Sequence, residues 1–69
     1  MENNFRKVLK ELRTGKGLSQ EELARELSVQ RYYISNLEQG RTEPDINMLI
    51  KLSQYFKVTV DYLVGIENS

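Results

Sequence analysis

Segment 29–36, VQRYYISN, contains side chains whose types and spacing suit recognition by hydrogen bonds and aromatic contact. If this segment is helical, Ile34 and Leu37 share one face, and Tyr32 lies almost opposite to them. Isolated aromatic side chains are common on protein surfaces, so the exposure of one tyrosine indicates no function by itself. The polar residues that accompany this tyrosine add both donors and acceptors, and they are Ser35, Asn36 and Gln39.

Residues that could carry out catalysis are poorly placed. The GKG triplet at 15–17 lacks the G-x-x-x-x-G-K-[ST] spacing of a phosphate-binding loop, and no strand precedes it. Glu21, Glu22 and Glu26 share no site at their spacing, and the serines have no histidine to activate them. Without cysteine or histidine the chain also lacks the usual soft metal ligands. We therefore predict no enzymatic activity, no cofactor and no metal site.

The composition is that of an ordinary globular protein. The 69 residues are 39% hydrophobic and 29% charged, which predicts one folded domain with no room for an effector-sensing domain. No apolar run approaches the ~20 residues that cross a bilayer, and the absence of cysteine fits a reducing compartment, so we expect a cytoplasmic protein with no membrane contact. Ten basic and ten acidic side chains cancel, which counts against a globally basic nucleic-acid binder.

Capping and stop signals predict five short helices and no strand. The expected helices span about 4–14, 19–27, 30–39, 45–56 and 59–64. Asn3 or Asn4 can cap the first, Ser19 with Glu22 forms a capping box for the second, and Asp45 and Thr59 cap the last two. The expected stops are Gly15 with Gly17, then Gly40, then Gly65.

Helical periodicity also predicts which side chains form the core. On the first three helices the inward residues are those at i, i+3 and i+4 spacing: Phe5, Val8, Leu9 and Leu12, then Leu23, Ala24 and Leu27, then Ile34 and Leu37. On the last two they are Ile46, Leu49, Leu52 and Phe56, then Val60 and Leu63, with Val64 as a further candidate.

Segment 19–40, SQEELARELSVQRYYISNLEQG, resembles the helix-turn-helix of the lambda-repressor and Cro type, the XRE-like proteins. The likeness extends over 5–65 and includes Leu12-Arg13 and the VDYL segment at 60–63. It implies an all-α, compact five-helix, lambda-repressor-like DNA-binding domain of bacterial or phage origin, associated with the nucleoid. Two positions depart from the pattern, because Ser28 replaces the usual glycine of the turn and Gln30 replaces a serine or threonine cap.

The resemblance implies that the third helix enters the major groove of double-stranded DNA. Arginine can pair with guanine N7 and O6, asparagine with adenine N6 and N7, and a tyrosine ring can pack on a thymine methyl group. Tyr33 lies on the flank of this helix, where we expect partial packing against the second helix. The residues predicted to contact bases are Gln30, Arg31, Tyr32, Ser35 and Asn36.

Other residues are expected to hold the docked helix in register. The resemblance implies phosphate contacts at the start of the second helix and just after the third, from Gln20, Gln39, Arg41 and Thr42. Arg13 and Glu38 match a pair that forms a buried ion pair in the family.

The last third of the chain has more apolar residues than an inward stripe requires. Proteins of the resembled type bind palindromic operators as homodimers with half-sites ~34 Å apart, so we expect a dimer interface of Val60, Tyr62 and Ile66. Occupying the operator would block polymerase, which predicts a repressor. Glu22 and Glu26 could also contact RNA polymerase, although simple solvent exposure is the more ordinary explanation of these carboxylates.

A protein-interaction module is the alternative function. Such a partner-binding or antitoxin-like small regulator would touch DNA weakly or not at all. The zero net charge favours this alternative, whereas the polar face of the third helix opposes it.

Overall fold

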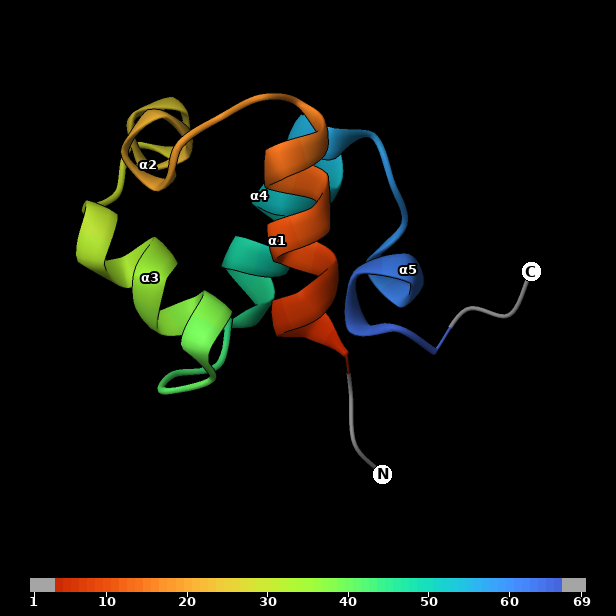
Figure 1. Cartoon of the computed structure of the whole chain (residues 1–69). Coiled ribbons are helices and arrows are strands. Elements are labelled where there is room, and N and C mark those ends of the chain that lie inside the picture. The colour runs from red at the N-terminus through yellow and green to blue at the C-terminus, as the bar shows by residue number, and fades with distance from the viewer. Residues whose placement is uncertain (1–3, 67–69) are drawn as a thin grey trace.

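A computed structural model describes residues 4–66, which form five α-helices and no strand. The helices are α1 (Phe5–Gly15), α2 (Gln20–Leu27), α3 (Arg31–Gln39), α4 (Ile46–Phe56) and α5 (Val60–Val64) (Figure 1). The predicted all-α fold is confirmed. Each helix begins one residue later than expected, because the residue before it has non-helical backbone angles and serves as the cap.

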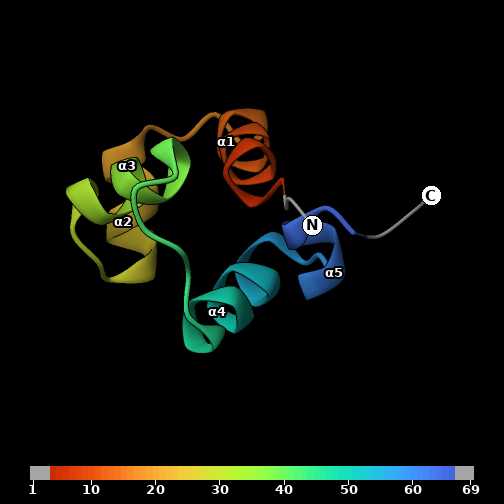
Figure 2. The same cartoon turned by 90° about the horizontal axis from the view of Figure 1, so that it is seen from below.

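Helix α1 lies between α3 and α5. It contacts α3 on one side and α5 on the other, while α2 packs mainly on α3 and α4 packs on α5 (Figures 1 and 2). Helix α3 therefore lies at the outer edge of the molecule, supported by α1 and α2. None of the helices in the described part of the chain has the length and apolar character needed to cross a membrane.

The core contains side chains from all five helices. Six of them are almost completely inaccessible to water, namely Leu9, Leu23, Ile34, Leu37, Leu52 and Leu63. One prediction about α4 is wrong, because Ile46 is 73% exposed and Met48 is buried instead. Two residues correspond to about 200° of helix rotation, so orienting Met48 and Leu52 toward the core turns Ile46 to water.

The first helix begins differently from our expectation. Asn4 precedes α1, but its side chain makes no capping hydrogen bond, and Asn3 lies outside the described residues. Instead, the backbone N–H of Asn4 donates to the carbonyl of Val64 at 3.1 Å, which joins the start of α1 to the end of α5. Gly15 belongs to α1 rather than ending it, and Gly17 adopts the left-handed conformation just beyond.

The expected caps of the other helices are present, except at α3. Ser19 Oγ accepts from the backbone N–H of Glu22 at 3.0 Å, and Glu22 Oε1 accepts from the backbone N–H of Ser19 at 2.8 Å. Asp45 and Thr59 accept in the same way from the third residue of α4 and of α5. Gln30 makes no side-chain cap, as its residue type predicted.

The capping box makes the start of α2 sensitive to acid. Hydrogen bonds from the backbone and then the side chain of Ser19 lower the pKa of Glu22 below its ordinary value of 4.5. A carboxyl group with a lowered pKa in the folded state stabilises the protein above its unfolded pKa, and this contribution is lost as pH falls. We therefore expect urea unfolding midpoints measured at about pH 6 and about pH 3 to differ less in Glu22→Gln than in the unmodified chain. The neighbouring Glu21→Gln serves as the control, and an equal effect of both substitutions would contradict this assignment.

Two non-glycine residues end helices in the left-handed conformation. Ser28 after α2 has φ 60°, as the comparison with the usual glycine predicted, and Lys57 after α4 has φ 58°, which the sequence did not indicate. Beyond Ser28, the N–H of Val29 donates to the carbonyl of Ala24 at 2.9 Å and closes the helix end.

Ser28 is consequently a site where glycine should stabilise the fold. A Cβ in the left-handed region costs about 1 kcal/mol, so we expect Ser28→Gly to raise the free energy of unfolding by roughly that amount. Chemical denaturation followed by circular dichroism measures the change. Ser28→Ala keeps the Cβ and should show no such gain; an equal gain in both variants would argue against backbone strain.

Candidate nucleic-acid interface

Helices α2 and α3 meet through the short turn at residues 28–30, and they make the most extensive helix pair of the described chain. The inner face of α3 is held by Ile34 and Leu37, which are buried. The outer face consequently points away from the bundle, and Tyr32 on it is 63% exposed. The turn and the buried face of α3 therefore present one polar helical surface to solvent.

The five residues predicted to contact bases all remain accessible. Gln30, Arg31 and Tyr32 are exposed, while Ser35 and Asn36 are half-buried. Ser35 Oγ accepts a hydrogen bond from Gln39 Nε2 at 2.9 Å along the same face. None of the five is enclosed in the core, so a ligand that covers α3 could reach each of them.

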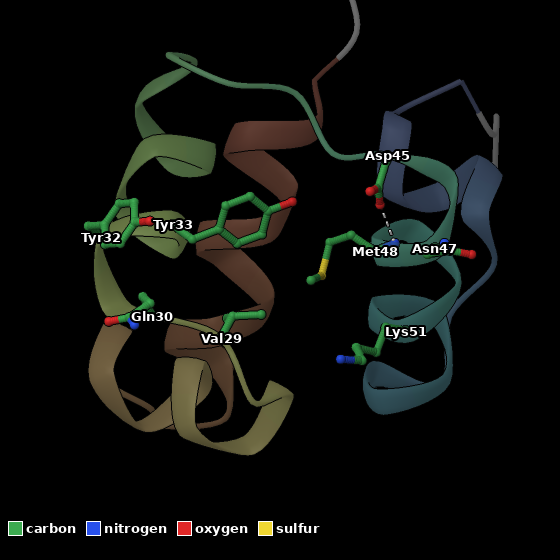
Figure 3. A pocket seen from close by; sticks show the side chains of 8 residues that line it. All are labelled: Val29, Gln30, Tyr32, Tyr33, Asp45, Asn47, Met48 and Lys51. Atoms are coloured by element: carbon green, nitrogen blue, oxygen red, sulfur yellow. Dashed lines mark hydrogen bonds between the residues drawn. The ribbon is translucent and has the colours of Figure 1, made fainter.

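The two adjacent tyrosines have different surroundings. The Tyr33 ring points from α3 toward α4, whereas the Tyr32 ring points away from α4 (Figure 3). Tyr33 is half-buried and lines an open groove of about 460 Å³ between the start of α3 and the start of α4, together with Asp45 and Met48. Burial, and then the negative charge of Asp45, raise the pKa of Tyr33 above its ordinary value.

Lys51 also lines this groove. Lys51 Nζ donates to the carbonyl of Leu27 at 2.9 Å and so joins α4 to the last turn of α2. A positive charge at a helix C-terminus interacts favourably with the helix dipole. The sequence did not identify this contact, because Leu27 and Lys51 are 24 residues apart.

The residues predicted to contact phosphates lie near the C-terminal end of α3 and at the start of α2. Gln39 and Arg41 are exposed, and Thr42 is half-buried. Gly40 ends the helix with φ 76°, and the N–H of Arg41 donates to the carbonyl of Asn36 at 2.9 Å, which fixes the start of the following loop. At the start of α2, Gln20 is half-buried, and its side-chain nitrogen donates to Glu38 Oε1 at 3.0 Å.

Arg6 is a further basic residue at the C-terminal end of α3. Its Nη1 lies 3.5 Å from the carbonyl oxygen of Gln39, within the limit of a hydrogen bond. A Cβ at Gly40 would come within 2.5 Å of the same nitrogen, so the absence of a side chain there admits the guanidinium. Sequence reasoning missed Arg6, since the contact joins residues 33 positions apart.

Arg13 of α1 and Glu38 of α3 form a bidentate ion pair between these two helices. Arg13 Nε donates to Glu38 Oε2 at 2.7 Å, and Nη2 donates to Oε1 at 3.1 Å. Their side chains are only 10% and 4% exposed, respectively. Arg13 Nη1 also donates to the carbonyl of Leu18 at 2.8 Å, which joins α1 to the loop before α2. Among the described residues, no buried side-chain nitrogen or oxygen lacks a hydrogen-bond partner.

Exposed apolar side chains also occur on α4 and around α5. Tyr62 and Ile66 are 44% and 46% exposed, and Val60 is half-buried, so all three residues of the predicted dimer interface have accessible area. Helix α4 adds Ile46 and Ile50, which are also exposed. Tyr55 is half-buried and packs edge-to-face on Phe56, with ring centroids 5.0 Å apart.

Comparison with known proteins shows that this chain is similar to transcriptional regulators. A family model described as helix-turn-helix matches residues 9–63. The chain is 44% identical over 64 residues to the HTH-type transcriptional activator BcrR of Enterococcus faecalis, covering 93% of this chain and 31% of that protein. It is 41% identical over 59 residues to the HTH-type transcriptional regulator ImmR of Bacillus subtilis, covering 86% of this chain and 46% of that protein.

A solved structure is similar over the whole chain. The crystal structure of a transcriptional regulator from Listeria innocua matches with a TM-score of 0.90 and 33% sequence identity, covering 100% of this chain and 64% of that chain. The present chain therefore spans less than two thirds of the length of each of these three proteins. All three are named as transcriptional regulators and none as an enzyme.

Proposed function

The chain belongs to the helix-turn-helix family, and we propose that it binds double-stranded DNA sequence-specifically to regulate transcription. The relatives named above are transcriptional regulators and not enzymes. In this proposal α3 lies in the major groove, because the groove of B-form DNA admits one helix. The observation that carries it is the outward polar face of α3, where Tyr32 is 63% exposed beside accessible hydrogen-bonding side chains.

The residues divide by the part of DNA they would contact. Arg31 and Asn36 suit the base edges, with Gln30, Ser35 and the Tyr32 ring beside them. Arg41, Thr42 and Gln39 suit the phosphates near the C-terminal end of α3, and the backbone amides that open α2 suit phosphates on the α2 side of the docked helix. Positive charge close to the docked helix matters here more than the net charge of zero, because salt screens charges beyond roughly 8 Å.

The proposal also includes a homodimer and repression of transcription. A homodimer joined through Val60, Tyr62 and Ile66 would bind a palindromic operator, and the exposed apolar area of α5 supports this choice. Occupying the operator would exclude polymerase, which makes the regulator a repressor. Glu26 on α2 is exposed and accessible to RNA polymerase in an activating arrangement. A regulator of this kind acts in the cytoplasm, at the nucleoid.

Selection of bound duplexes from a random DNA pool tests the proposal. We expect recovery of a palindromic sequence, binding far weaker to a scrambled duplex, and log affinity that falls linearly with log salt concentration. Sedimentation of the complex reports whether two chains bind one duplex. Recovery of no preferred sequence, with no salt dependence, would reject DNA regulation and favour the protein-interaction module.

A further inference from the structure

The side chain of Arg6 lies over the C-terminal end of α3, although Arg6 itself belongs to α1. A Cβ on Gly40, the residue that ends α3, would come within 2.5 Å of Arg6 Nη1 and 3.2 Å of its Cδ. The side chain therefore follows the surface of this glycine. The start of α1 and the end of α3 lie at the same end of the molecule (Figure 1). The packing of α1 on α3 thus brings a guanidinium to the end of the helix proposed to enter DNA.

Most donors of the Arg6 guanidinium remain available to a ligand. A guanidinium has five N–H donors, and Arg6 has one hydrogen-bond partner in the described part of the chain, the carbonyl of Gln39. That contact is 3.5 Å long, at the limit of the hydrogen-bond range. Within residues 4–66 no carboxylate forms an ion pair with Arg6, and its side chain is exposed. The positive charge of Arg6 is consequently not neutralised within the protein.

The loop after α3 has little positive charge of its own. Arg41 and Glu43 are both exposed, and with two residues between their positions their Cα atoms are at most ~7.6 Å apart. This separation is shorter than the ~8 Å over which salt screens charges, so the two charges largely cancel for a phosphate nearby. The C-terminus of α3 also carries the negative end of the helix dipole, which disfavours an anion. Arg6 supplies the surplus positive charge at this end.

We propose that Arg6 binds a DNA phosphate, so that the phosphate site after α3 is shared between α1 and the loop that contains Arg41. This inference rests on the proposed function. The planar fork of a guanidinium matches the oxygens of a phosphate, and a side chain already held against Gly40 loses less conformational freedom on binding. Arg31, proposed to contact a base, begins α3, whereas Arg6 lies at its other end. Arg6 therefore contributes affinity and no base preference.

A purely structural role of Arg6 predicts a different result. If Arg6 only stabilises the end of α3 through the Gln39 carbonyl, its removal lowers stability and leaves the salt dependence of DNA binding unchanged. A phosphate contact instead contributes about 0.9 to the slope of log affinity against log salt concentration. Between about 50 and about 200 mM salt, one such contact corresponds to a change of about 3.5-fold in affinity.

The test measures affinity at these two salt concentrations for the selected duplex and for a scrambled duplex. We expect Arg6→Ala to lower the ratio of low-salt to high-salt affinity by about 3.5-fold, equally for both duplexes. Lys7→Ala is the matched control, because it removes the same charge from an exposed neighbour two residues from the buried Phe5 and Leu9, on the opposite face of α1. Its ratio should equal that of the unmodified chain. Arg6→Lys retains the charge and should retain the ratio.

The readout tolerates a partly inactive variant. Each ratio compares one preparation at two salt concentrations, so a constant inactive fraction cancels. The inference is overturned by an unchanged ratio in Arg6→Ala, by an equal loss in Lys7→Ala or Arg6→Lys, or by a loss confined to the selected duplex. Failure of the unmodified protein to bind either duplex in a salt-dependent way would instead reject the proposed function.

Discussion

Replacing Arg13 with alanine is expected to lower the free energy of unfolding by about 3–5 kcal/mol. The substitution removes the two donors that Arg13 supplies to Glu38 and leaves the carboxylate, 4% exposed, without its opposite charge. It also leaves the carbonyl of Leu18 without its donor. In a domain of this size such a loss is a large part of the total stability. Urea unfolding followed by circular dichroism at neutral pH measures it.

Two further variants establish that the loss comes from the unpaired charge. Arg25→Ala removes an exposed arginine of α2 and should change the unfolding free energy by less than about 0.5 kcal/mol. The double variant Arg13→Met with Glu38→Leu removes both charges together, so we expect it to recover most of the stability, because apolar pairs often replace buried ion pairs without loss. A double variant as unstable as Arg13→Ala would show that shape, not charge, dominates at this site.

Replacing Asn36 or Arg31 with alanine is expected to weaken binding to the selected duplex by about 1–3 kcal/mol each. Each substitution removes a side chain that can bond two atoms of one base, so the preference should relax at one base pair and remain elsewhere. Electrophoretic or fluorescence titration with duplexes altered one base pair at a time measures both effects. Asn36 is half-buried and Arg31 is exposed, and both lie on the outer face of α3, where side chains can be truncated without opening the core.

Arg41→Ala provides the contrasting case. Arg41 is exposed just after α3, and a phosphate contact there should strengthen the binding of the protein to all duplexes to the same extent. Its removal is expected to weaken binding uniformly and to reduce the slope of log affinity against log salt by about one. If Arg31 and Asn36 can both be removed while every base preference persists, the assignment of α3 to base contact is wrong.

Local features of the sequence were sufficient to predict much of the fold. Capping depends on residues within one helical turn, so Ser19 with Glu22, Asp45 and Thr59 could be recognised directly. The left-handed conformation of Ser28 was predicted from the resemblance instead, because the family usually has glycine at this position of the turn. Periodicity predicted the buried faces of α2 and α3 correctly. On α4 it placed Leu49, Leu52 and Phe56 correctly against the core but put Ile46 inside in place of Met48, because several apolar residues there allow more than one inward face.

The same reasoning could predict only part of the candidate site. The polar face of α3 is a property of one helix, so its members could be named before their positions were known. Their roles at the base edges and phosphates stay predictions. Arg6 beside Gln39 and Lys51 on Leu27 were missed, because each contact joins residues more than twenty positions apart. The side-chain partners of Gln20 were also beyond sequence reasoning, since they come from a different helix.

By itself, the sequence determined an all-α chain, the bounds of its helices to within one residue, and an outward polar face on the segment that became α3. These properties arise from interactions within about one turn of a helix, which spacing along the chain records. Only the tertiary structure decided that Met48 lies inside and Ile46 outside, and that Gln20 joins the buried Glu38 to the exposed Arg31. Such contacts depend on how whole helices pack against one another, and local periodicity does not specify that arrangement.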